Sequence, residues 1–164
     1  MTEHKMLRRL AFGAYCLLMV YLLFLQRGRS PIFGGGYVNT MLANLNLCPG
    51  AEIQRFLRVW NDPMYHRAAV VNLVGNIIMF IPLGFCLPWA NAPLRRFWKT
   101  LLVSAGIIIL VEAVQLVTLL GRCDVDDLIL NLIGVTVGYL LWKMTALLVK
   151  KKIQQIARRY SNEI

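Results

Sequence analysis

The stretch EAVQLVTLLGRCDVDD, residues 112–127, decides how the rest of the sequence is interpreted. It begins inside one long apolar segment and ends at the start of another, so the carboxyl group of Glu112 directly follows the apolar run Ile107–Val111. A charged side chain near the centre of a bilayer costs about 3 kcal/mol even on the lowest scales, and such residues usually face a bundle interior, a water-filled cavity or an opposite charge. The sequence therefore predicts that other polar groups gather around Glu112.

The whole chain is too apolar for an ordinary soluble domain of its length. It has 164 residues, of which 58% are hydrophobic, and a mean hydropathy of +0.58, which indicates a membrane protein. The formal net charge is +10. In a membrane chain, basic residues mark the cytoplasmic ends of spans and contact anionic lipid. No stretch combines aromatic and basic residues as nucleic-acid-binding modules do, so we expect membrane lipids rather than nucleic acid as partners.

Four apolar segments predict four transmembrane helices. They are residues 10–25, 69–90, 100–120 and 127–149. The first is slightly short for a span, but no small-residue cleavage site follows it, which favours an uncleaved helix over a signal peptide. The second contains Pro82, which is tolerated in a spanning helix and predicts a kink. The expected fold class is all-α: a single polytopic membrane domain over residues 1–164, with a bundle of four transmembrane helices.

The first outer loop, residues 26–68, is expected to contain a short amphipathic helix at residues 51–60. Its apolar positions recur with helical spacing, at Ile53, Phe56, Leu57 and Trp60. Two arrangements fit this pattern. The helix lies in the membrane interface with Trp60 at headgroup level, or it packs on top of the bundle itself.

The placement of lysine and arginine predicts the orientation. With the N-terminus in the cytoplasm, eleven basic residues fall in inside segments: Lys5, Arg8, Arg9, Arg95, Arg96, Lys99, Lys150, Lys151, Lys152, Arg158 and Arg159. Six fall in outside segments: Arg27, Arg29, Arg55, Arg58, Arg67 and Arg122. Because cytoplasmic segments carry the excess of basic residues, this pattern favours both termini in the cytoplasm. Residues 150–164 then form a basic, solvated cytoplasmic tail.

This topology places nearly all intramembrane polar side chains in the outer half of the bilayer. Glu112 and Gln115 lie roughly 8 to 12 Å from the outer end of the third span, at about 1.5 Å of rise per residue. The other members of the group are Asn72, Asn76, Arg122, Asp124, Asp127 and Asn131. Their helical spacing places those of each span on one face. The sequence predicts a polar pocket that is built from spans two, three and four and opens toward the outside.

A stripe of small residues continues one of these faces. Gly134 and Gly138 lie on the same side of the fourth span as Asp127 and Asn131, and a small-xxx-small motif permits two helices to approach closely. We therefore expect this stripe to face another helix.

Together these residues resemble the VanZ-like family. The matching motifs are Asn72-x-x-x-Asn76-Ile77-x-x-Phe80-x-Pro82-x-Gly84, Glu112-x-x-Gln115, Gly121-Arg122-x-Asp124-x-Asp126-Asp127 and Asn131-x-x-Gly134-x-x-x-Gly138. The resemblance implies a bacterial protein of the cytoplasmic membrane, from a family named for a protein linked to teicoplanin resistance. The family's biochemical activity is poorly defined. We find no phosphate-cradling loop or nucleophile–base arrangement that supports the phosphotransbutyrylase-type label the family has also carried.

Each polar group also has a purely structural interpretation. Glu112 is then protonated and hydrogen-bonded to an asparagine, because a neutral carboxylic acid is cheaper to bury than a carboxylate. Asn72 and Asn76 then join helices through hydrogen bonds worth about 0.6 kcal/mol each. At least one aspartate of residues 124–127 caps the fourth helix. Arg122 is then a counter-ion to one of the acids.

No metal or cofactor is predicted. The four cysteines lack the C-x-x-C spacing of zinc and redox motifs. Glu112 and the aspartates of residues 124–127 offer oxygen ligands, but their spacing matches no calcium loop. Cys48 and Cys123 both fall outside, and whether they pair in an oxidising compartment is left open.

Three functional hypotheses follow. The leading one is a protein that binds or handles an amphiphilic envelope ligand: a lipid-linked wall precursor, a lipid or a lipoglycopeptide such as teicoplanin. The second is a membrane-embedded enzyme for a lipid-linked substrate, with Glu112 as general base and Arg122 stabilising negative charge. Ser104 is about two turns from Glu112, so no serine nucleophile is expected. The third is a structural partner in a larger complex. The sequence names neither the ligand nor the oligomeric state.

Overall fold

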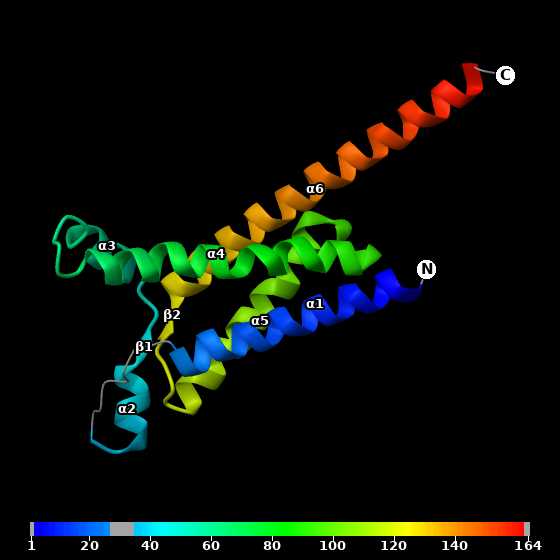
Figure 1. Ribbon diagram of the computed structural model, residues 1–164. Helices are drawn as coiled ribbons and strands as arrows, with labels where there is room; N and C mark the ends of the chain where they lie inside the picture. Colours follow the sequence, from blue (N-terminus) through cyan, green and yellow to red (C-terminus); the bar gives the residue numbers. More distant parts are fainter. Residues whose placement is uncertain (1, 27–34, 163–164) are drawn as a thin grey trace.

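The computed structural model describes residues 2–26 and 35–162, and its described part is almost entirely helical (Figure 1). In chain order the elements are α1 (Thr2–Val20), the π-helical turn η1 (Tyr21–Gln26), α2 (Tyr37–Ala43), β1 (Leu45–Asn46), α3 (Ala51–Arg58), α4 (His66–Ala90), the 3₁₀ turn η2 (Ala92–Arg95), α5 (Phe97–Val117), β2 (Cys123–Asp124) and α6 (Val125–Asn162). The all-α prediction is confirmed. Arg27 and Arg29, which entered the orientation argument, lie outside the described residues.

Within residues 2–26 and 35–162, three helices are long and apolar enough to cross a membrane: α4, α5 and α6. They correspond to the second, third and fourth predicted spans. The apolar part of α1 is shorter, Leu10–Phe24, and at about 1.5 Å per residue it covers roughly 22 Å of a hydrocarbon core that is about 30 Å thick. The first span, and with it the count of four, therefore stays a prediction.

Helices α4 and α6 pack backbone against backbone, and three glycines make this contact possible. A Cβ atom would lie 2.1 Å from the carbonyl oxygen of Ile77 at Gly134, 2.0 Å from that of Ile81 at Gly138 and 2.0 Å from that of Val135 at Gly84. Real side chains do not tolerate such distances, so only glycine fits. The stripe of small residues on the fourth span does face another helix, as its spacing indicated.

Helix α1 packs against this helix pair through its second half. Met19 and Leu23 are buried in one apolar core with Phe80 of α4, Ile108 of α5 and Val135 of α6. The Tyr15 hydroxyl also donates to the carbonyl of Met79 at 3.0 Å. The core therefore lies among four helices, although only three have the length and composition of spans.

The described part of the loop before α4, which holds α2, β1 and α3, lies at one end of the bundle, and both termini lie toward the other end (Figure 1). Strand β1 pairs in parallel with β2, Leu45 opposite Cys123 and Asn46 opposite Asp124. The sequence predicted neither this pairing nor α2. The predicted amphipathic helix is present as α3, which contacts α4 and α6. Of the predicted apolar positions Ile53, Phe56, Leu57 and Trp60, only Leu57 is exposed, with 56% of its surface accessible. Most of the apolar face therefore packs on the bundle.

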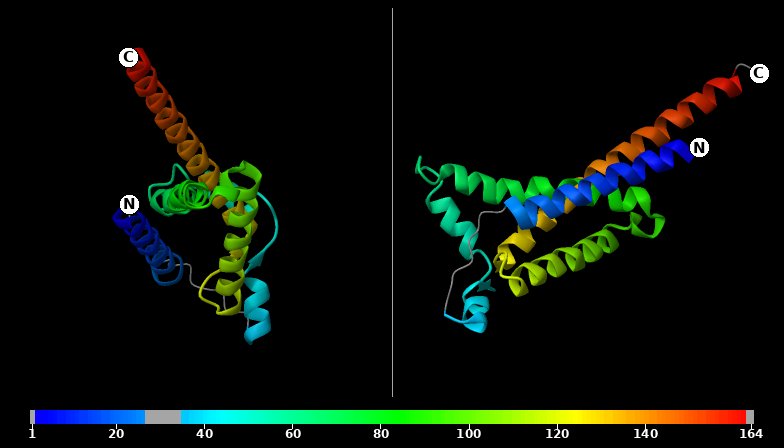
Figure 2. Two further views of the ribbon diagram at one scale, coloured as in Figure 1. Left: turned by 90° about the vertical axis from the view of Figure 1, so that its right-hand side faces the viewer. Right: turned by 60° about the horizontal axis from the view of Figure 1, so that its bottom comes forward.

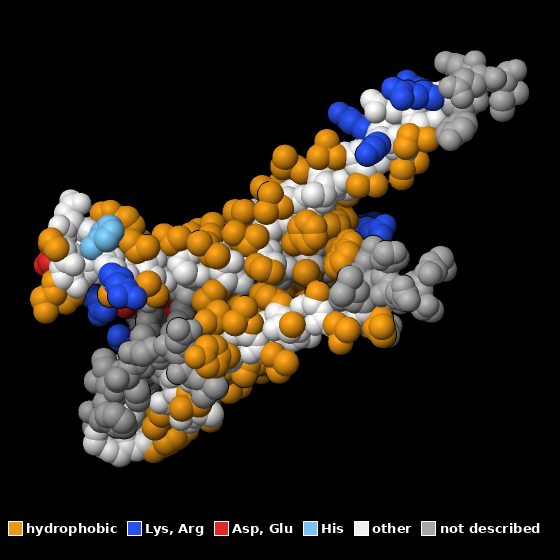
Figure 3. Space-filling view, in the orientation of Figure 1, with side chains coloured by type: hydrophobic (Ala, Val, Ile, Leu, Met, Phe, Trp, Pro, Cys, Tyr) orange, Lys and Arg blue, Asp and Glu red, His pale blue; other side chains and the backbone are white. Residues whose placement is uncertain are grey.

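The basic tail is not separate from the last span. Helix α6 runs without interruption through Val149 to Asn162, a length of 38 residues, and projects well beyond the other helices (Figures 1 and 2). No glycine or proline occurs after Gly138 to end it, and Lys, Arg, Gln and Ala are good helix formers. The lysines and arginines of its far part form a basic end (Figure 3).

Candidate functional site

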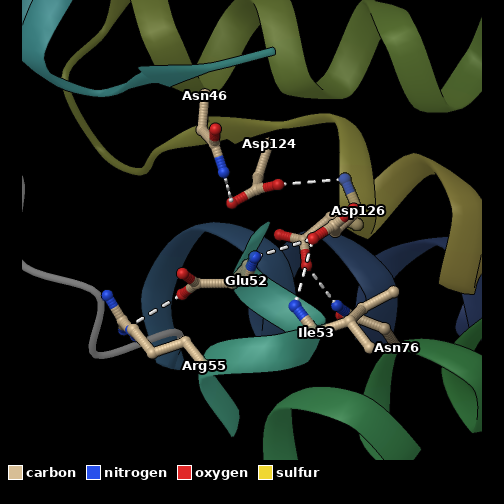
Figure 4. Close-up of polar contacts among 8 residues, drawn as sticks. Asn46, Glu52, Ile53, Arg55, Asn76, Asp124 and Asp126 are labelled. Carbon is tan, nitrogen blue, oxygen red and sulfur yellow. Dashed lines mark hydrogen bonds and ion pairs between the residues drawn. The ribbon is translucent and has the colours of Figure 1, made fainter. Parts of the chain in front are cut away.

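Asp124 organises the turn between α5 and α6. Its carboxylate accepts a hydrogen bond from the Asn46 side-chain amide of β1 at 3.1 Å and another from the backbone N–H of Asp126 at 2.9 Å (Figure 4). The second bond satisfies one of the free N–H groups at the start of α6, as a capping residue does. The interpretation that at least one aspartate caps this helix is therefore confirmed.

Asp126 caps a different helix, and the sequence analysis missed this role. Its carboxylate accepts from the backbone N–H groups of Gly50, of Glu52 at 2.8 Å and of Ile53 at 3.1 Å, so it anchors the first turn of α3 to the start of α6. The residue before α3 is Gly50, which has no side chain to cap the helix itself. That missing cap was the one signal in the sequence for an acid supplied from elsewhere.

Asn76 and Asp127 join α4 to α6 next to this contact. The Asn76 side-chain amide donates to the Asp127 carboxylate, and the two residues are 2% and 0% exposed. Hydrogen bonds to charged groups are stronger than neutral ones, and a buried carboxylate depends on such donors. This pair therefore places an acid inside the bundle at the same end as Asp124 and Asp126.

Helix α5 contributes Glu112 and Gln115 from its buried face. Glu112 is 4% exposed and Gln115 is 1% exposed. The Gln115 side-chain amide donates to the carbonyl of Leu23 at 2.8 Å. Gln115 and Glu112 are both buried on α5, as the sequence predicted, and Gln115 connects this face to η1.

Cys123 lies among three of the acids. Burial raises the pKa of its thiol, and the carboxylates of Glu112, Asp124 and Asp127 raise it further. Acids from α5, β2 and α6 thus all act on the electrostatics of this turn. All four cysteines are free thiols, so Cys48 and Cys123 are not joined.

Three of the predicted residues carry buried polar atoms with no hydrogen-bond partner within the described structure. Asn131 is 1% exposed, and both its Oδ1 and its Nδ2 are unpaired. Asn72 and Arg122 are half-buried, and each has one such atom, Oδ1 and Nε respectively. No ion pair joins Arg122 to Glu112 or Asp124 in the described part of the chain, so the counter-ion interpretation finds no contact there. We call the residues Asn72, Asn76, Glu112, Arg122, Asp124, Asp126, Asp127 and Asn131 the polar cluster.

The cluster contains no arrangement that marks a known reaction. Ser104 is buried on the same face of α5 as Glu112, but eight residues of rise separate them by roughly 12 Å. Among the described residues, no group of three or more His, Cys, Asp and Glu side chains is placed to hold a metal ion. Pro82 lies within α4, which continues past it to Ala90.

The fold and the cluster together define a polytopic helical membrane protein with buried acids and amides at one end of its bundle. The family model described as VanZ/LLP1 matches residues 12–149, and the chain belongs to that family. This membership fits a membrane protein linked to glycopeptide resistance. No curated protein matches the chain, and no solved structure does.

Proposed function

We propose that the protein binds an amphiphilic envelope ligand at the polar cluster, in the outer leaflet of a bacterial cytoplasmic membrane. The candidate ligands are a lipid-linked wall precursor, a lipid headgroup and a lipoglycopeptide such as teicoplanin. One observation carries the proposal: the carboxamide of Asn131, one helical turn after Asp127 on α6, is buried with both its polar atoms unpaired within the described structure. A buried polar group without a partner costs about 1 to 3 kcal/mol, and a ligand group would remove that cost.

The unpaired atoms come from different elements of the same end. Asn72 lies in the first part of α4, Asn131 in the first part of α6, and Arg122 in the turn before it. Together they offer one guanidinium donor, one amide donor and two amide acceptors. A polar headgroup suits such a mixed set, and its acyl chains would then lie along the apolar outer surfaces of the helices.

The orientation supports a ligand on the outer side. The basic end of α6 and the chain termini lie away from the cluster (Figures 1 and 3). Since basic segments are retained in the cytoplasm, the cluster would face outward. Lipids and glycopeptides of the envelope are present on that side.

The proposal is tested in cells challenged with teicoplanin. We expect Glu112→Gln and Arg122→Ala each to lower the tolerated concentration at normal expression, because they remove an acid and a cation from the cluster. Arg58→Ala is the matched control, since Arg58 is exposed on α3. If both cluster variants protect cells as well as the parent protein does, the cluster is not the working site.

A second experiment separates binding from catalysis. The purified protein is mixed with a labelled lipid-linked wall precursor in mild detergent, and both retention and turnover are followed. Stoichiometric retention that is weakened by Asn131→Leu supports binding. Turnover that is lost in Glu112→Gln would instead assign Glu112 the role of general base.

A further inference from the structure

The segment that contains α2 and β1 has no charge and leaves its apolar side chains uncovered. No charged residue occurs from Gly35 to Leu47. Five large apolar side chains of this segment are well exposed: Tyr37 at 52%, Val38 at 59%, Leu42 at 57%, Leu45 at 36% and Leu47 at 67%. Within α2 the buried residues are instead polar, as Thr40 at 3% shows. This is the reverse of what a helix facing water presents.

The segment is fixed beside the membrane-facing surface of α5. The Tyr37 hydroxyl donates to the carbonyl of Val117, at the last turn of α5, at 2.7 Å. Val117 and Leu120 are themselves exposed, at 57% and 50%. The apolar surface of this spanning helix therefore continues onto α2, and a tyrosine marks the junction as tyrosines do at membrane interfaces.

The neighbouring helix α3 lies at the same end of the bundle but has a different surface. It carries Arg55 and Arg58. On its apolar face, Leu57 is the one residue that is well exposed. It contacts α4 and α6. The two short helices of the outer loop therefore differ in charge, in exposed apolar surface and in the helix that each one adjoins.

We propose that α2 and β1 insert into the outer-leaflet interface and that their partner is the lipid surface itself. Val38 and Leu42 lie on one side of α2 and enter the region between headgroups and acyl chains. The inserted segment then holds its depth through the Tyr37 bond to α5 and through the pairing of β1 with β2. This inference concerns how the protein sits in the bilayer and does not rest on the proposed function.

A second copy of the chain is a less suitable occupant. Stable protein interfaces use about 20 to 30 residues on each side, whereas this surface offers five apolar side chains on a segment of 13 residues. It also has no charges to fix a partner's register. A lipid surface needs neither a large matching interface nor charges that fix its position.

The test measures the depth of nitroxide labels in the full-length protein, reconstituted in liposomes of equal parts phosphatidylethanolamine and phosphatidylglycerol. The four native cysteines are replaced by serine, and single labels are placed by Val38→Cys and Leu42→Cys. Leu102→Cys on the exposed face of α5 is the hydrocarbon reference, and Asn61→Cys in an exposed turn is the water reference. We expect the ratio of oxygen to nickel-chelate accessibility at both α2 labels to be several-fold higher than at Asn61→Cys.

Two results would overturn the proposal. A ratio equal to that of Asn61→Cys places α2 in water. Dipolar broadening between α2 labels that disappears on dilution with unlabelled protein places a second copy on this surface. If the labelled α2 variants do not fold, a bimane label at Leu47→Cys replaces them. Quenching of its fluorescence by brominated lipid supports insertion of the segment, and no quenching contradicts it.

Discussion

Asn76 on α4 and Asp127 on α6 form a buried hydrogen bond between two parallel helices, in the half of the bundle that also holds α3 and the strand pair. The glycine contacts of Gly134 and Gly138 with α4 follow it along α6 toward the other end. The close approach of the two backbones thus places the acid and the amide within bonding distance.

Removing the amide of this pair will destabilise the protein. We expect Asn76→Ala to lower the free energy of unfolding by about 1 to 3 kcal/mol, because it takes a donor from a buried carboxylate. Asn72→Ala is the matched control one turn earlier on α4, and it should destabilise by no more than about 0.5 kcal/mol because its Oδ1 has no partner to lose. Thermal unfolding in detergent measures both. Equal losses in the two variants would contradict the assigned role of Asn76.

Adding one methyl group to the glycine stripe will separate α4 from α6. In Gly138→Ala the new Cβ would lie 2.0 Å from the carbonyl oxygen of Ile81, so the helices must move apart, at a cost of about 1 to 3 kcal/mol or more. Gly106→Ala on α5 meets no atom within 4 Å and should be neutral or stabilising by up to about 1 kcal/mol. The melting temperature of Gly138→Ala should fall well below that of the parent protein, and the melting temperature of Gly106→Ala should stay the same or rise. A Gly138→Ala variant as stable as Gly106→Ala would refute the close packing.

Asp126 holds α3 onto the bundle. In Asp126→Ala the three backbone N–H groups of the first turn of α3 lose their acceptor, so we expect hydrogen exchange over residues 50–58 to become much faster. Asp62→Ala removes an exposed acid that bonds only its own turn and should leave that region protected. Hydrogen exchange with mass spectrometry reads both variants. Unchanged protection in Asp126→Ala would mean that other contacts hold α3.

The thiol of Cys123 will report the charge on Glu112. Only the thiolate reacts with alkylating reagents, and burial together with three carboxylates raises the pKa of this thiol. Alkylation should therefore need a higher pH in the folded protein than in the unfolded chain. Glu112→Gln removes one negative charge near the sulfur, so the pKa falls and the rate profile moves to lower pH. The measurement uses a protein with Cys123 as its single cysteine.

The exposed acid Asp62 provides the control for that experiment. Asp62→Asn should leave the alkylation profile of Cys123 where it was, because Asp62 is not among the acids that act on the thiol. A profile that stays unchanged in Glu112→Gln as well would show that Glu112 is neutral or far from the turn.

Local patterns in the sequence predicted the helices that cross the membrane and one contact between them. Hydropathy located α4 and α5 and the start of α6 within a few residues, but it ended the last helix at residue 149, whereas α6 continues to Asn162. The spacing of Gly134 and Gly138 identified the face that meets α4. These features depend on residues three or four positions apart, which share a helix face. Whether α1 spans the membrane could not be predicted from hydropathy in the same way, because its apolar stretch, Leu10–Phe24, is short and its flanks carry charge.

Contacts between distant parts of the chain could not be predicted in this way. Asn46 bonds Asp124 across 78 positions, and Asp126 reaches the backbone of Ile53 across 73. Gln115 shares a helix face with Glu112 but bonds Leu23, because α1 packs where the sequence offered no reason to place it. These contacts depend on how the loop before α4 and the end of α1 fold back onto the bundle. The spacing of residues within one helix does not contain this information.

The central claim is that the polar cluster faces away from the cytoplasm, and the sidedness of two thiols tests it most directly. Cys48 is exposed at the cluster end, and Lys151→Cys places a thiol on the basic end of α6; each is studied as the sole cysteine. We predict that a membrane-impermeant maleimide labels Cys48 in intact spheroplasts and reaches Lys151→Cys only after permeabilisation. Labelling of Lys151→Cys in intact spheroplasts, with Cys48 protected until they are opened, would contradict the account.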